Sequence, residues 1–203
     1  QFLKSDADPS DFTGLKHGLA AGETLSPESR AAWDAAVGKP IYEALGMTEV
    51  STFLSSSPKA PHKAGTAGRP QPGRHVALLP AEGGETPTPL GNPGVISVHR
   101  SDPGLMLGYW RDEAQTSAAM RGDWFLTGDV GQMDSEGYIT FLGRNDDMMN
   151  ALGYRVAPEE VEAALIAHPD IQAATAVEVR VRSDLSLIAA FIECPGEKPS
   201  DKV

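Results

Sequence analysis

Three charged residues in the second half of the chain, each close to a glycine, have types and spacing suited to nucleotide chemistry. Asp129 ends a Thr-Gly-Asp triplet, which predicts a carboxylate at the mouth of a tight turn, able to accept hydrogen bonds from two vicinal ribose hydroxyls. Arg144 and Arg155 carry guanidinium groups, rigid forks of donors for a ribose hydroxyl or a phosphate. Gly153 lets the backbone approach a ligand closely. The spacing alone leaves two interpretations open: a nucleotide site, or solvated charges beside ordinary turn glycines.

Longer motifs surround these residues. They are Trp124-Phe125-Leu126-Thr127-Gly128-Asp129, Gly143-Arg144-Asn145-Asp146-Asp147, and Gly153-Tyr154-Arg155-Val156 with Glu159-Glu160-Val161-Glu162. In type and order they resemble the acyl-adenylating enzymes, which include acyl- and aryl-CoA synthetases, luciferases and the adenylation domains of peptide synthetases. The resemblance covers nearly the whole chain. It implies that Asp129, Arg144 and Arg155 contact ATP or AMP. It also implies that Gly153 lies near the thiol of CoA, although Leu152 replaces a frequent Ser, and that Asp146 is the hinge of a mobile small domain.

A motif nearer the start of the chain, Leu45-Gly46-Met47-Thr48-Glu49, resembles the aromatic-Gly-x-Thr-Glu motif of the same family. The Thr48 hydroxyl can donate to a phosphate oxygen, and the Glu49 carboxylate offers Mg²⁺ a hard oxygen ligand. The resemblance therefore implies catalytic roles for both, with Glu49 as the metal ligand. It also implies ATP or AMP contacts for Gly22, Glu23, Glu43, Ala44, Leu45, Gly46, Met47 and Thr48. Alternatively, Gly-x-Thr-Glu is an N-cap turn, and Glu23 belongs only to the loop before a helix.

Two further segments match the family. Gly65 to Pro70 is interpreted as turn scaffolding, and Gly108-Tyr109-Trp110, followed by Glu113 and Thr116, supplies aromatic side chains that we expect to pack against the protein.

Composition narrows the class of protein. The chain has 203 residues, 40% of them hydrophobic, with a net charge of −11 and no run of Lys or Arg, so nucleic acid is excluded as a main partner. The single cysteine, Cys194, forms no internal disulfide, which fits a cytoplasmic protein. No signal peptide and no apolar run of membrane-spanning length is visible. The chain starts at Gln1 rather than Met, which we interpret as truncation. A homodimer is left open.

In the first part of the chain, residues 1–58, the sequence pattern predicts strands that alternate with helices and form a parallel sheet. Residues 1–11 are expected to be a loop, and Phe12 to Leu19 a strand end. Ser26-Pro27-Glu28 predicts a helix start that runs to Val37 and stops at Gly38. A short strand at 41–44 is then followed by a turn at 45–49.

With the pattern of the remaining residues, the sequence predicts a protein of α/β and α+β class that is made of two domains. Residues 59–143 form a β-rich subdomain with an antiparallel sheet or small barrel, and complete a large domain of residues 1–143. Its expected strands are Val76–Leu79, Val95–Val98 and Tyr138–Leu142, with a helix at 111–120. Residues 144–203 begin a small α+β domain. It has a helix from Ala157 to His168, a half-buried strand through Val177, Val179 and Val181, and a second strand at 185–192.

The hypothesis that follows is a piece of a carboxylate–CoA ligase of fatty-acid or aromatic-acid metabolism, using ATP, Mg²⁺ and CoA. The alternatives are an amino-acid adenylation domain that loads a carrier protein, and a non-catalytic module on the same scaffold. Phe125 and Leu152 depart from the adenylation-domain pattern and favour the ligase. The resemblance places the phosphate-loop lysine before Gln1 and the catalytic lysine after Val203, so the chain alone is predicted to be inactive.

Overall fold

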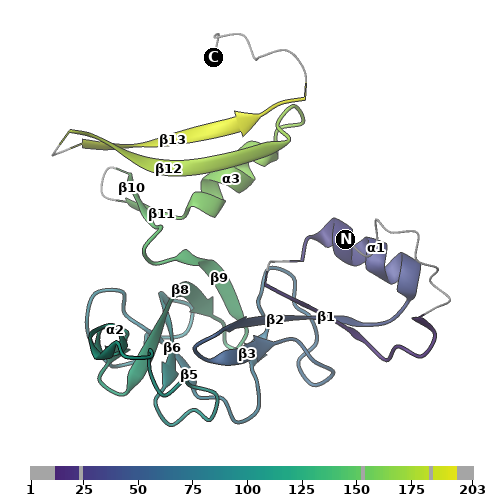
Figure 1. Cartoon of the computed structure of the whole chain (residues 1–203). Coiled ribbons are helices and arrows are strands. Elements are labelled where there is room, and N and C mark those ends of the chain that lie inside the picture. Colours follow the sequence, from purple (N-terminus) through teal and green to yellow (C-terminus); the bar gives the residue numbers. More distant parts are fainter. Residues whose placement is uncertain (1–11, 23–24, 152–153, 183–184, 196–203) are drawn as a thin grey trace. The chain divides into compact units, whose positions relative to one another are not determined.

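The computed structural model describes residues 12–22, 25–151, 154–182 and 185–195. The chain divides into two compact units, which are Gln1–Thr127 with Gly131–Phe141, and Gly128–Val130 with Leu142–Val203. Their helices and strands are labelled in Figure 1. The loop expected at 1–11 and the turn expected at Ser183-Asp184 lie outside the described residues.

The first unit opens with β1 (Gly18–Ala21), α1 (Pro27–Val37) and β2 (Ile41–Met47), and α1 lies beside the two strands (Figure 1). The helix has the predicted bounds because its signals are local. The Ser26 hydroxyl accepts a hydrogen bond from the Ser29 N–H at 3.1 Å, and Gly38 closes the helix with φ 62°. β1 and β2 pair in parallel, as predicted, with Ala21 opposite Ala44. β1 nevertheless begins at Gly18, later than the predicted Phe12.

β2 is longer than the predicted strand, because its last residues pair with β3 (Ser51–Ser55). In this antiparallel pairing Gly46 lies opposite Thr52 and Met47 opposite Ser51. The turn predicted at 45–49 therefore shortens to the residues between β2 and β3. β4 (Arg69–Pro70) adds a second antiparallel pair, so the sheet is mixed rather than wholly parallel.

The β-rich part of the first unit forms another sheet, in the strand order β5-β6-β8-β7 with β9 paired to β8. Its elements are β5 (Val76–Leu79), β6 (Pro93–His99), α2 (Glu113–Ala118), β7 (Met120–Arg121), β8 (Trp124–Met133) and β9 (Ile139–Arg144). β5–β6 and β7–β8 are antiparallel, which confirms the predicted antiparallel unit. α2 is shorter than the helix predicted at 111–120, because Asp112 is its N-cap and accepts a hydrogen bond from the Gln115 N–H.

β8 was not predicted as a strand. The Thr-Gly-Asp triplet lies inside it, so the expectation of a tight turn at Asp129 is wrong. The physical reason is Gly128, which takes a φ of 81° within the strand and so has the conformation of a turn residue without ending the strand. Thr127 and Asp129, the residues directly before and after this glycine, are both buried.

The core of the first unit joins β3 to the strands of the antiparallel sheet. Its buried cluster consists of Val50, Phe53, Leu54, Leu78, Ile96, Val98, Phe125 and Ile139. Full burial of one such side chain stabilises a fold by about 1.5–3 kcal/mol. Val50 directly follows Glu49, so a completely buried anchor fixes the turn that carries this candidate site residue.

The second unit contains β10 (Met149–Ala151), β11 (Tyr154–Val156), α3 (Pro158–Ile166), β12 (Ala173–Arg182) and β13 (Leu185–Glu193). The strands form the antiparallel pairs β10–β11 and β12–β13, and α3 lies along β12 (Figure 1). α3 ends before the predicted His168. The prediction of a half-buried face through Val177, Val179 and Val181 is wrong, since these side chains are 38%, 41% and 53% exposed while Ala176 on the other face is buried. None of the described helices is long and apolar enough to cross a membrane.

At Gly68 the main chain lies very close to the main chain of Ser55, and this packing can be tested by substitution. We expect Gly68→Ala to lower the free energy of unfolding by about 2–4 kcal/mol. An added Cβ would lie 2.2 Å from the carbonyl carbon of Ser55, and Gly68 has a φ of 101°. The measurement is thermal or chemical unfolding. Gly65→Ala is the matched control, because Gly65 also has a positive φ of 76° but has no atom within 4 Å of the added Cβ. Equal losses for both variants would contradict the packing argument.

Candidate functional site

The parallel pair β1–β2 brings together the first group of predicted nucleotide residues. Ala21 is paired with Ala44, so Gly22 and the segment 43–47 lie where both strands reach their carboxyl ends. Gly22 has a φ of 95°, which ends β1 in a turn. Parallel strands commonly bind ligands at this edge. Glu23 lies outside the described residues.

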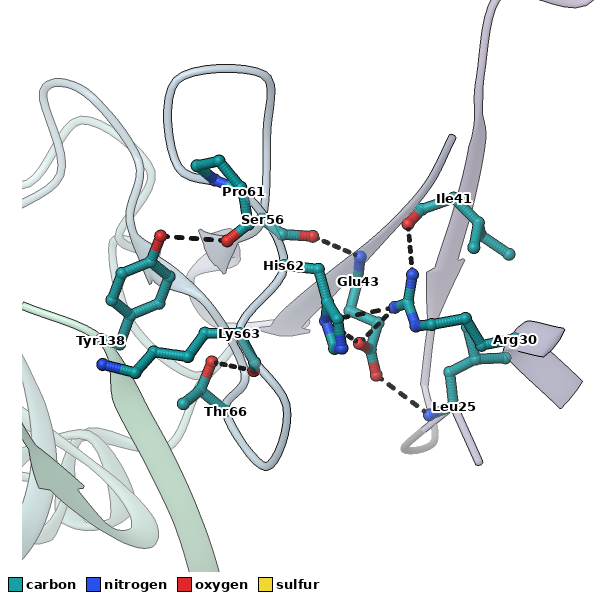
Figure 2. A network of polar contacts seen from close by, with 10 residues as sticks. All are labelled: Leu25, Arg30, Ile41, Glu43, Ser56, Pro61, His62, Lys63, Thr66 and Tyr138. Atoms are coloured by element: carbon teal, nitrogen blue, oxygen red, sulfur yellow. Dashed lines mark hydrogen bonds and ion pairs between the residues drawn. The ribbon is translucent and has the colours of Figure 1, made fainter. Parts of the chain in front are cut away.

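The Glu43 side chain has partners within the fold (Figure 2). Its Oε2 atom lies 2.6 Å from Nη2 of Arg30 and 2.9 Å from Nδ1 of His62, and its Oε1 atom accepts a hydrogen bond from the Leu25 N–H at 3.2 Å. Arg30 also donates to the carbonyl of Ile41 at 2.9 Å. The carboxylate thus ties α1 and the loop after β3 to β2. Nothing in the sequence between residues 30 and 62 indicates this network, because its members are distant along the chain.

The same loop is held at its other end by Tyr138, which also appears in Figure 2. The Tyr138 hydroxyl donates to the carbonyl of Pro61 at 3.0 Å, and the Lys63 ammonium lies 5.2 Å from the Tyr138 ring centroid. Lys63 also pairs with Asp134 and Glu136. These interactions position the loop that brings His62 to Glu43.

Ala44 and Leu45, also predicted to contact ATP or AMP, face the protein. Ala44 is buried, while Leu45 and Met47 are partly buried and pack against the hydrophobic core. Contact between Leu45 and ATP or AMP stays a prediction.

Thr48 and Glu49 stand on the turn between β2 and β3. The Val50 N–H donates to the carbonyl of Met47 at 3.1 Å, and Ser51 leaves the turn with a φ of 61°, unusual for a residue other than glycine. Gly46 permits this turn, because a Cβ there would lie 2.7 Å from the Ser51 carbonyl oxygen. The Thr48 side chain is exposed, as a phosphate ligand needs to be, and Glu49 is half-buried.

Glu49 is held by a loop that sequence analysis assigned to packing. The hydroxyl of Tyr109 donates to Oε1 of Glu49 at 3.0 Å, and the Met106 N–H donates to the Glu49 carbonyl at 2.7 Å. Burial and this hydrogen bond raise the pKa of Tyr109 above its ordinary value. The expectation that the aromatic residues of this loop pack is wrong for Trp110, which is 86% exposed.

The chemistry of Glu49 fits a metal ion that arrives with a nucleotide. Among the described residues no group of three or more His, Cys, Asp or Glu side chains could hold a metal ion by itself. Mg²⁺ is commonly bound by one or two carboxylates together with phosphate oxygens and water. A single half-buried carboxylate beside an exposed threonine suits that arrangement.

Asp129 and Arg144, predicted from the sequence to act together, form an ion pair in the second unit. Arg144 Nη1 lies 2.9 Å from Oδ1 of Asp129, and Arg144 Nε lies 3.2 Å from Oδ1 of Asp146. Burial raises the pKa of Asp129, and the hydrogen bond and charge of Arg144 act against that increase. The ion pair with Arg144 therefore offsets part of the cost of burying the Asp129 carboxylate.

Gly128 makes room for this ion pair. A Cβ on Gly128 would lie 2.9 Å from Nη2 of Arg144, so no larger residue fits beside the guanidinium without displacement. The Gly128 carbonyl also accepts a hydrogen bond from the Asn145 N–H at 2.7 Å. The glycine that misled the strand prediction thereby positions both charged residues.

The other predicted residues are less fully described. Arg155 belongs to β11, where it pairs with Asn150, and Gly153 lies outside the described residues. Asp146 follows β9 in a turn, with its side chain 68% exposed. The residues at 22 and 43–49 belong to the first unit, and Asp129, Arg144, Asp146 and Arg155 to the second.

Known proteins resemble the chain in sequence and in fold. It is 36% identical over 193 residues to the rat (Rattus norvegicus) mitochondrial acyl-coenzyme A synthetase ACSM3, covering 94% of this chain and 33% of the relative. The structure matches the anthranilate CoA ligase AuaEII, solved in complex with anthranoyl-AMP, with a TM-score of 0.76 and 31% identity, over 98% of this chain and 38% of that one.

A second structural match is the amide bond synthetase McbA from Marinactinospora thermotolerans, with a TM-score of 0.80 and 28% identity, over 98% of this chain and 40% of that one. The chain thus spans about a third of the length of the curated relative it matches. Its residues 1–110 match the model of the AMP-binding enzyme family. Since this match covers more than half of the chain and the rat relative is 36% identical, the chain belongs to the AMP-binding enzyme family.

Proposed function

We propose that the chain is part of a longer ATP-dependent acid–thiol ligase, called the parent below. In the first half-reaction, a carboxylate oxygen attacks the α-phosphorus of ATP, the bond to the bridging oxygen breaks, and pyrophosphate leaves. In the second, the sulfur of CoA attacks the acyl carbon, the bond to AMP breaks, and the thiol proton is released. The observation that carries the proposal is the buried Asp129 carboxylate, which pairs with Arg144 beside the strand glycine Gly128.

The described side chains have distinct parts in this proposal. Asp129 and Arg144 orient the ribose, and the exposed Thr48 hydroxyl donates to a phosphate oxygen. Glu49 would hold Mg²⁺, which supplies positive charge against the phosphates when bound. Gly22 and residues 43–47 would contact the nucleotide, while Glu23, Arg155 and Gly153 keep the nucleotide and CoA roles predicted for them.

For the acid substrate and for the acceptor, we propose only the chemical class. A small carboxylate is supported by the name of the rat relative and by the anthranoyl-AMP bound in the ligase neighbour. The structural match to an amide bond synthetase supports a second class of acceptor, in which an amine replaces the thiol. Pyrophosphate release measured on the parent with ATP, Mg²⁺ and a panel of aromatic and aliphatic acids tests adenylation. Thiol and amine acceptors, added separately, then identify the second half-reaction.

The compartment of the parent is also a proposal. A chain whose only cysteine is Cys194 forms no internal disulfide, which supports a reducing compartment such as the cytoplasm. The rat relative, by contrast, is named as mitochondrial. Fractionation of cells that express the parent distinguishes the two. A homodimer stays a proposal, which sedimentation of the parent would test.

We expect Asp129→Ala in the parent to weaken ATP binding by at least tenfold, because each hydrogen bond to a charged group contributes about 1.5–3 kcal/mol. The KM for the acid should change less than twofold. Calorimetric titration with ATP and steady-state kinetics measure the two effects. Asp123→Ala is the matched control, since Asp123 is 60% exposed in an ion pair with Arg100, a type that contributes little. Unchanged ATP affinity in Asp129→Ala would remove this residue from the ribose role.

We expect Asp146→Pro in the parent to slow thioester formation at least tenfold while adenylate formation stays within about twofold, since Pro fixes φ and restricts a hinge. Single-turnover assays of each half-reaction measure this. Asp146→Ala is the control, because it removes the contact with Arg144 but leaves the backbone free to rotate. The hinge assignment fails if Pro slows both half-reactions equally, or if Ala reproduces the effect of Pro.

A further inference from the structure

We infer that Tyr109 is a positioning residue, which holds the Glu49 carboxylate so that its second oxygen faces a nucleotide-bound divalent cation. The inference rests on the proposed function and adds a residue to it. Its basis is one contact between side chains that are 60 residues apart in the sequence. The Tyr109 hydroxyl donates to Oε1 of Glu49 at 3.0 Å.

One oxygen of the Glu49 carboxylate carries the contact with Tyr109. Oε1 accepts the Tyr109 hydrogen bond, and within the described part of the chain Oε2 accepts none. A carboxylate free to rotate presents its oxygens in many directions, whereas one fixed at Oε1 presents Oε2 in a defined direction. Because Mg²⁺ demands near-ideal octahedral geometry, such preorganisation favours binding.

The Tyr109 side of this contact is built to be rigid. The Tyr109 N–H donates to the Thr116 hydroxyl at 2.9 Å, and that hydroxyl donates to the Asp112 carbonyl at 2.8 Å. A Cβ on Gly108 would lie 3.1 Å from the same Thr116 side chain. Arg111, just after the aromatic pair, has a φ of 56°, a conformation that a surface loop without other constraints rarely adopts. Helix α2 therefore fixes the backbone from which the phenol extends.

The Glu49 side is fixed to the same loop by main-chain and buried polar contacts. Met106 donates its N–H to the Glu49 carbonyl at 2.7 Å, and Arg74 donates to the carbonyl of the adjacent Val50. Arg74 Nη1 also lies 3.0 Å from Oδ1 of Asp102, whose carboxylate is completely buried. Two backbones locked together in this way leave the phenol and the carboxylate little freedom to part. A contact made only to fill space would not need the hydroxyl.

The test is Tyr109→Phe in the parent, which keeps the ring and deletes the hydroxyl. We expect the Mg²⁺ concentration for half-maximal adenylation to rise roughly tenfold, with the KM for the acid unchanged. Mn²⁺ affinity in the presence of ATP, read by electron paramagnetic resonance without turnover, should weaken by a similar factor. Ser97→Ala is the control, because it also removes a hydroxyl that donates to a main-chain carbonyl, that of Val95 at 2.9 Å, but lies outside the candidate site. It should leave both metal measurements within twofold of the wild type.

A double-mutant cycle with Glu49→Gln assigns the effect to the pair. If Tyr109 acts through the Glu49 carboxylate, Tyr109→Phe should change the Mn²⁺ affinity less than twofold in the Glu49→Gln background. A tenfold change in that background would overturn the inference, as would a Tyr109→Phe variant with wild-type Mg²⁺ and Mn²⁺ dependence. Failure of the proposed function is distinguishable. In that case the wild-type parent releases no pyrophosphate with any acid, while Tyr109→Phe still weakens Mn²⁺ binding in the presence of ATP.

Discussion

The first unit depends on a buried ion pair between Arg74 and Asp102. Asp102 accepts hydrogen bonds from the N–H groups of His75 and Gly104 as well as the ion pair at 3.0 Å, and Arg74 also donates to Val50. A Cβ on Gly104 would overlap the guanidinium at 1.8 Å. Removing one partner of such a pair typically costs about 3–5 kcal/mol, because a buried charge is left alone. The start of β5, the turn after Glu49 and the loop that leads to Tyr109 therefore share one anchor.

Local signals explain which elements the sequence predicted well. α1 has the predicted bounds because Ser26, Pro27 and Gly38 each act within one turn of the chain. β2 and β8 were misjudged at Gly46 and Gly128, because a glycine demanded by a neighbouring backbone or side chain has the same appearance in sequence as a turn glycine. Which face of β12 is covered depends on α3 and other packing partners, and alternation of valines cannot identify the partner.

Contacts among the candidate site residues were predicted where a motif supplies its own geometry, and were missed where distant segments meet. Asp129 and Arg144 were expected to act together, and the adjacent strands β8 and β9 do bring them into contact. Tyr109 was assigned to packing, because nothing in a Gly-Tyr-Trp segment reveals a carboxylate sixty residues earlier. Glu43 was assigned to ATP or AMP, and its side chain also binds Arg30 and His62, which lie outside the motifs quoted from the sequence.

The guanidinium of Arg144 contacts Asp129 through Nη1 and Asp146 through Nε, so two carboxylates share a single cation. Under the proposed function, ribose hydroxyls that compete for Asp129 would alter the partition of this charge, and a rotation of the backbone at Asp146 would alter it from the other side. Thermodynamic linkage makes such a coupling reciprocal. If a change at Asp129 shifts the equilibrium at Asp146, a change at Asp146 shifts the equilibrium at Asp129 by the same free energy. Under the proposed function, nucleotide binding at Asp129 and the backbone angle at Asp146 would therefore be coupled through the Arg144 side chain rather than through the fold.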